Sequence, residues 1–97
     1  MNVLIVRAKL KEENLADAQA ATGKVIQALE QAGREDVRYT VLSDGPVLIA
    51  LLVLNPDGSH PLATLPAYAE LVESLKGWYA EPPTVERMTV LGSYQLF

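Results

Sequence analysis

Apolar residues follow two different periods along this chain, and each change of period marks the boundary of an element. Val3 to Val6 is a continuous apolar run rich in β-branched residues, so Asn2 to Leu10 is expected to form a strand. From Lys11 to Ala32 the apolar residues recur at helical spacing, which predicts a helix that Gly33 suits as terminator. The shared face of this helix carries Leu15, Ala18, Thr22, Val25, Ile26, Leu29 and Ala32.

The second part of the chain predicts a hairpin, a helix and a last strand. Strands are expected from Asp36 to Asp44 and from Pro46 to Leu54, joined by a turn at Gly45. A helix is expected from Pro66 to Lys76, and a long strand from Thr84 to Phe97. The order βαββαβ predicts a ferredoxin-like α+β fold with a four-stranded antiparallel sheet, as one domain over residues 1–97.

The four strands differ in how apolar they are, and this difference predicts their order in the sheet. The first and third strands are the most continuously apolar, so they should be the central ones. The second and fourth should lie at the edges, because they carry Arg38, Thr40, Glu86, Arg87 and Thr89.

The third strand is apolar on both of its faces. It offers Val47, Ile49, Leu51 and Val53 to one side and Leu48, Ala50, Leu52 and Leu54 to the other. In this fold both helices cover the same face of the sheet, so the other face of a lone chain should be polar. An apolar uncovered face predicts a homodimer formed through the open sheet face. The alternative is that loops or the C-terminal segment cover it.

Composition narrows the classes of function and partner. The chain has 97 residues, no cysteine and a formal net charge of −4, so disulfides and thiolate metal sites are excluded and nucleic-acid binding is not expected. The longest apolar run, Val47 to Leu54, is far shorter than the roughly 20 residues that span a bilayer, so no membrane association is expected. Met1 leads directly into a strand without a targeting signal, which favours a cytoplasmic location.

Two C-terminal segments carry a resemblance to a known superfamily. Residues 75–83 (LKGWYAEPP) and 89–94 (TVLGSY), with the length and the element order, resemble uncharacterised bacterial members of the dimeric α+β barrel proteins. That superfamily includes the antibiotic-biosynthesis monooxygenase-like domains. The resemblance implies a dimer that binds a small organic molecule in a cavity between sheet and helices. Its activity would be that of a cofactor-independent monooxygenase or an isomerase, and the alternative is a non-catalytic binding or structural dimerisation module.

The resemblance does not extend to the haem-degrading members. Those proteins use a first-strand Asn, a Trp and an iron-ligating His near the second helix. Asn2 and Trp78 are present here, but no histidine follows Trp78, and the lone histidine, His60, lies upstream of the helix. No cofactor is therefore expected.

His60, Trp78 and Tyr79 are candidates for a site. His60 could act as a general base or metal ligand oriented by Asp57, but one His and one Asp are too few ligands, so no metal is expected. The alternative is an ordinary loop residue beside a proline. Trp78 and Tyr79 could stack on a flat aromatic ligand. Alternatively, if Gly77 ends the helix, Trp78 folds back on its last turn near Val72 and serves packing.

Three arginines on strands form the other candidate set. Arg7 alternates with Leu4, Val6 and Ala8, which should face the helices, and the same alternation places Arg38 and Arg87 on the uncovered face too. Guanidinium groups suit carboxylates, so these arginines are expected to bind an acidic group of a ligand. The alternatives are pairing with acids at the sheet margin, such as Glu35, or with a carboxylate across the dimer interface.

Overall fold

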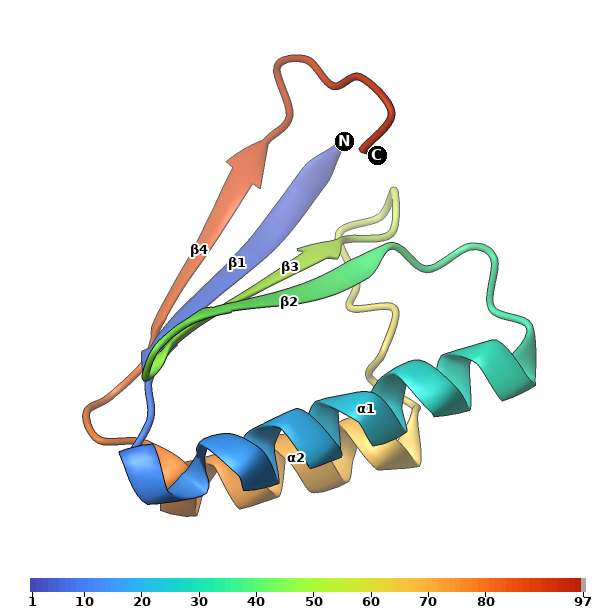
Figure 1. Ribbon diagram of the computed structural model, residues 1–97. Helices are drawn as coiled ribbons and strands as arrows, with labels where there is room; N and C mark the ends of the chain where they lie inside the picture. The colour runs from blue at the N-terminus through green and yellow to red at the C-terminus, as the bar shows by residue number, and fades with distance from the viewer. Residues whose placement is uncertain (97) are drawn as a thin grey trace.

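The computed structural model describes residues 1–96 and contains the expected order of elements (Figure 1). They are β1 (Asn2–Lys9), the short 3-10 helix η1 (Glu12–Asn14), α1 (Leu15–Ala32), β2 (Tyr39–Asp44), β3 (Val47–Val53), α2 (Pro66–Trp78) and β4 (Thr84–Thr89). The ferredoxin-like α+β prediction is confirmed.

The four strands form one antiparallel sheet in the order β2-β3-β1-β4. The apolar strands β1 and β3 are therefore central and the more polar β2 and β4 lie at the edges, as predicted. Both helices lie on one side of the sheet, with α1 and α2 next to each other (Figure 1). The sheet thus has one face covered by helices, called here the covered face, and one open face.

The covered face is defined by the strand register. Leu4 lies opposite Leu52 and Leu52 opposite Tyr39, so these three side chains share one face. Leu52 forms the core with Leu54 and Leu62, which is 0% exposed. The residues packed against this core are Leu4, Leu29, Val37, Tyr39, Leu65 and Tyr68.

The open face is also apolar. Val3 lies opposite Val53 and Met88, and Ile5 lies opposite Leu51. Leu42, which is opposite Ile49, is 52% exposed, and Met88 is 50% exposed. The expectation of a sheet that is apolar on both faces is confirmed.

The observed helix ends differ from the predicted ones for local reasons. The first three predicted helical residues after Lys11 form the tighter 3-10 turn η1, and α1 begins at Leu15. Gly33 ends α1 in the left-handed conformation (φ 64°), as expected. The second helix continues through Gly77 to Trp78 rather than ending at Lys76, so the alternative in which Gly77 ends it does not hold. Contacts with residues distant in sequence stabilise these two additional helical residues. Lys11 Nζ donates to the Gly77 carbonyl, and Leu10 pairs with Tyr79.

The last strand is shorter than predicted. β4 ends at Thr89 rather than continuing toward Phe97, because Thr89 already lies opposite Asn2, the first residue of its partner strand. Beyond the hydrogen bond from the Val90 amide to the Met1 carbonyl, residues 91–96 leave the edge of the sheet, and Leu96 lines a hollow with Leu42 and Leu51 of the open face. Leu91 and Tyr94 in this segment are 101% and 87% exposed. Phe97 lies outside the described residues.

Within residues 1–96, neither helix combines the length and the apolar character that crossing a membrane requires.

Candidate functional site

A cavity lies between α1 and the β2–β3 hairpin, in the layer that separates helices from sheet. Its volume is about 470 Å³. The buried residues Leu10 and Ala18 form its floor, and part of its wall is half-buried. The other wall residues are exposed, so the cavity opens to solvent at Ala16, Gln19, Ser43 and Gly45. The lining residues are Leu10, Leu15, Ala16, Ala18, Gln19, Thr22, Val41, Ser43, Gly45 and Leu48.

Small side chains on α1 create this space. Ala18 is 2% exposed, and its side chain at the floor of the cavity is a single methyl group. A leucine or phenylalanine at a buried helix position usually fills such a gap at the density of protein interiors. The cavity therefore results from the placement of alanines on the helix face that turns toward Leu48.

The chemistry of the cavity wall is neutral. Gln19, Thr22 and Ser43 supply an amide and two hydroxyl groups, and none of the ten lining residues is charged. Such a wall matches the usual character of small-molecule sites, which are mostly apolar with a few polar groups that fix orientation. It suits an uncharged ligand with hydroxyl or carbonyl groups.

His60 lies at the other end of the same layer. The hairpin end of β3 is at Val47 and Leu48, whereas the loop that carries His60 follows Val53, about 20 Å further along the sheet. His60 Nε2 lies 3.2 Å from the Tyr68 hydroxyl, and the Leu62 amide donates to His60 Nδ1 at 3.1 Å. Neither His60 nor Tyr68 lines the cavity.

The Leu62 amide determines the protonation of the ring. Because Nδ1 accepts this bond, it carries no proton, and the neutral imidazole holds its proton on Nε2. Nε2 therefore donates to the Tyr68 oxygen. Burial, and next the charge of Arg87, lowers the pKa of His60, while burial raises the pKa of Tyr68. The pair is held neutral at pH 7, and its geometry closes the loop onto α2.

Asp57 does not orient His60, and this part of the prediction is wrong. Its Oδ1 accepts hydrogen bonds from the Ser59 amide at 2.9 Å and the Ser59 hydroxyl at 2.6 Å. These bonds lower the pKa of Asp57 and turn its carboxylate toward its own loop. Among residues 1–96 no group of three metal-ligating side chains occurs around His60 or elsewhere.

The three arginines do not converge. Arg7 lies opposite Ile49 and Thr84 on the open face, as predicted, and its side chain has no ion pair or hydrogen bond with residues 1–96. Arg38 precedes β2 on the same face, where its carbonyl accepts from the Val53 amide. Arg87 was predicted there too, which is wrong. It lies opposite Leu4 on the covered face, with Nη1 3.5 Å from the Gly58 carbonyl.

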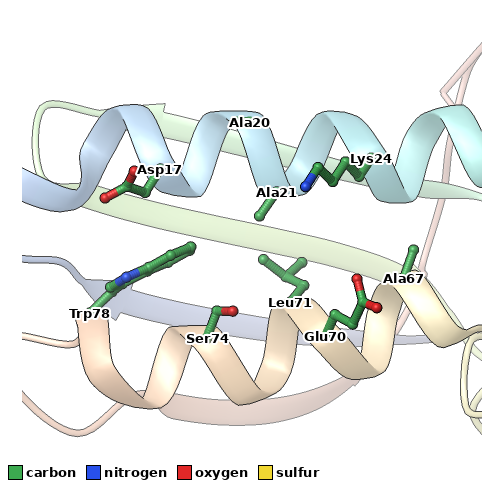
Figure 2. A pocket seen from close by; sticks show the side chains of 9 residues that line it. All are labelled: Asp17, Ala20, Ala21, Lys24, Ala67, Glu70, Leu71, Ser74 and Trp78. Carbon is green, nitrogen blue, oxygen red and sulfur yellow. The ribbon is translucent and has the colours of Figure 1, made fainter.

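Trp78 and Tyr79 lie at the end of α2 but do not share a pocket. Trp78 is the last residue of the helix, and its ring extends into the groove between α2 and α1 (Figure 2). Tyr79 pairs through its backbone with Leu10, and burial raises the pKa of its hydroxyl. Trp78 and Tyr79 therefore lie in different environments, and they do not form the pair that was expected to stack on one ligand.

The residues that line the cavity were not predicted as a site. Thr22 was the one available signal, because it is a hydroxyl residue within the otherwise apolar stripe of α1. Gln19 and Ser43 resemble ordinary surface residues in the sequence. Only the register of β2 and β3 brings Ser43 opposite Leu48 at the cavity mouth.

The fold matches solved structures over nearly the whole chain. One neighbour, described as "Putative antibiotic biosynthesis monooxygenase from Nitrosomonas europaea", is 20% identical with a TM-score of 0.70, over 95% of this chain and 100% of that one. A protein of unknown function from the same organism is 19% identical with a TM-score of 0.67, over 96% of this chain and 91% of that one. A protein from Mycobacterium tuberculosis is 16% identical with a TM-score of 0.62, over 95% and 96%.

These comparisons confirm the expected resemblance at the level of the fold. Identities of 16–20% carry no information about the reaction. No protein-family profile and no curated protein matches the sequence.

Proposed function

We propose that this protein binds a small, uncharged, flat organic molecule in the cavity between α1 and the β2–β3 hairpin. The observation that supports this is the cavity itself, which has about 470 Å³ of space, a buried apolar floor and three neutral polar groups. This volume lies within the range of ligand pockets, about 300–1,000 Å³. A side-chain-filled layer would instead favour a purely structural role.

The reaction that we propose is a monooxygenation without a cofactor, in which the substrate supplies the electrons. A phenol with an unsubstituted para carbon can react as phenol plus O₂ giving a quinone plus water. The para C–H carbon and the C–OH carbon both become carbonyl carbons. One oxygen atom of O₂ bonds to the para carbon, and the other leaves as water with the two hydrogens lost from the phenol. The cavity would hold the substrate in a fixed position, and Thr22, Ser43 and Gln19 would orient the phenol oxygen.

A non-catalytic binding module is the second candidate. It is favoured by the lining, which offers no titratable group to remove the phenolic proton. The two candidates differ in one measurement, the consumption of O₂ by the protein–phenol mixture. A binder leaves the rate at that of buffer.

We also propose that the chain acts as one domain in a homodimer built through the open face. The apolar residues Leu42 and Met88, half exposed there, and Leu91 and Tyr94 beyond β4 support this. Exposed apolar side chains on both edge strands of one sheet face are typical of an interface, and a second copy is the simplest cover.

The cavity proposal is tested by filling the cavity. A naphthol should raise the melting temperature of the unaltered protein by several degrees at saturation, since a bound ligand stabilises the native state. Ala18→Leu, which adds three carbons at the floor, should abolish this shift. Ala69→Leu, on the exposed side of α2, is the matched control and should keep it.

The outcomes separate binding from catalysis. If the naphthol stabilises all three proteins equally, or none, the cavity is not the site. If it stabilises only the unaltered and control proteins but no quinone or O₂ uptake appears, the binding proposal stands and the oxygenase proposal fails.

A further inference from the structure

A second groove lies on the outer side of the helix pair, facing away from the sheet (Figure 2). It has a volume of about 300 Å³. The side chains that line it are Asp17, Ala20, Ala21 and Lys24 from α1, and Ala67, Glu70, Leu71, Ser74 and Trp78 from α2. The proposed function does not use any of these residues.

Small side chains keep the groove open. Ala20 and Ala21 of α1 and Ala67 of α2 line the groove, and the buried Leu71 lies across from Ala21 (Figure 2). The helices run in opposite directions, so Asp17 lies at the same end as Trp78, and Lys24 at the same end as Glu70 (Figure 2). The groove therefore has an apolar centre and two polar ends of different character.

The end at Trp78 favours a positive charge. The half-buried indole ring extends toward α1, with the Asp17 carboxylate on the opposite helix (Figure 2). Asn14 Nδ2 donates to Asp17 Oδ2 at 3.1 Å, while Oδ1 has no hydrogen bond from residues 1–96. A carboxylate and an indole ring that line the same end of one groove are both groups that attract ammonium ions.

The helix end beside Trp78 already has a cation of the chain's own. The chain's own Lys11 Nζ donates to the Gly77 carbonyl at 3.1 Å, one residue before Trp78. The last carbonyls of a helix carry partial negative charge, so this helix end already holds one ammonium group. The charge of Lys11 offsets part of the attraction, which makes contact with Asp17 and the ring necessary for a second cation.

The opposite end is electrically balanced. Lys24 and Glu70 carry opposite charges across the groove, and neither forms an ion pair within residues 1–96. A ligand with a second positive charge there would meet Lys24. The charge pattern therefore fits a ligand with one cationic end.

We propose that this groove binds a linear primary alkylammonium ion. The ammonium group lies between the Trp78 ring and Asp17 Oδ1, within reach of the Ser74 hydroxyl, and the alkyl chain lies on Ala20, Ala21 and Leu71. Asp17 and Lys24 are seven residues apart on α1, which is about 10 Å at the helical rise, so a chain of about six carbons fits between them.

The groove contains its own reporter, because Trp78 is the chain's one tryptophan. We expect hexylammonium to change the Trp78 fluorescence in a saturable way at neutral pH. Hexanol, which has the same chain without the charge, should bind at least about tenfold more weakly, and hexanoate should not bind.

Substitution at Asp17 separates this site from unspecific binding. Asp17→Asn should weaken hexylammonium about threefold to fivefold, because Asp17 is exposed, while Glu73→Gln, which removes an exposed carboxylate of α2 outside the groove, should leave the binding unchanged. Amide chemical shifts should move at Ala20, Ala21 and Ser74. Equal binding of hexylammonium and hexanol, equal binding by the Asp17 variant, or shifts confined to the cavity near Leu48 would each overturn the proposal.

Discussion

The two faces of the sheet carry similar apolar side chains in very different surroundings. Leu52 on the covered face is 3% exposed, whereas its neighbour Leu51, on the open face, is only half-buried. The helices complete the covered face within one chain, whereas the open face is covered only in part. Val3 is 5% exposed and Leu96 of the C-terminal segment lines a hollow with Leu42 and Leu51, but Leu42 and Met88 remain half exposed. The helix-covered core therefore does not account for all of the apolar surface that this sequence places on its sheet.

A residue of the covered face should cause the greatest loss of stability when it is replaced. Leu52→Ala should lower the free energy of unfolding by about 2–5 kcal/mol, because it leaves a cavity in a packed core. Urea unfolding followed by circular dichroism measures this change. The loss should be the same at low and high protein concentration, and a concentration-dependent loss would place Leu52 at an intermolecular contact instead.

The next effect lies one residue away, on the open face. Leu51→Glu should convert a dimer of twice 10.5 kDa into a monomer, weakening association about a hundredfold or more, because the carboxylate would be buried between two sheets. Light scattering coupled to size exclusion gives the mass. A monomeric unaltered protein, or a variant that remains dimeric, would refute the open face as the interface.

His60 should make the free energy of unfolding depend on pH. Since burial and Arg87 lower its pKa below the ordinary 6.5, the unfolded chain takes up a proton at a higher pH than the folded one. The stabilisation is fully present above pH 6.5 and is lost as pH falls through the lowered pKa of the folded state.

The matched variant is His60→Asn. Its side-chain oxygen can accept from the Leu62 amide at every pH, as in an Asx-turn. Unfolding free energies measured from about pH 5 to about pH 8 should rise with pH for the unaltered protein and be flatter for the variant. Parallel curves would mean that His60 does not titrate on unfolding.

The smallest effect is expected at Arg7. If Arg7 binds an acidic ligand, Arg7→Met should leave the dimer intact or slightly more stable, within about 1 kcal/mol, and should abolish stabilisation by acidic compounds in a thermal-shift screen. If Arg7 instead pairs with a carboxylate across the interface, the same change should weaken the dimer. In that case no acidic compound should stabilise the unaltered protein.

Patterns carried by adjacent residues predicted the fold well. The β-branched run at Val3 to Val6 and the two-sided strand at Val47 to Val53 indicated the central strands because burial on both faces requires such residues. Arg7 was placed correctly since its neighbours in β1 alternate clearly between faces. Arg87 was not, because Thr84 to Thr89 is exposed throughout and gives no local sign of which side faces the helices.

The features that sequence did not predict depend on contacts between distant segments. Trp78 remains helical because Lys11 and Leu10 hold the end of α2, and no nearby residue signals that. The cavity is a space left by small residues such as Ala18. An alanine in a helix favours the helix equally well whether its methyl group packs against Leu48 or borders an empty space, so the sequence does not reveal the cavity. A site that is formed by packing can therefore be predicted only when the register of the strands and the positions of the helices are known.

The exposure of β4 has a consequence for behaviour at high concentration. All six of its residues are exposed, and its outer edge presents backbone groups that no strand of residues 1–96 pairs with. Such an edge can recruit strands from other molecules and start aggregation. Glu86 and Arg87 lie in the middle of this strand, where charge opposes stacking of further strands. Neutralising both should leave the fold unchanged and reduce solubility.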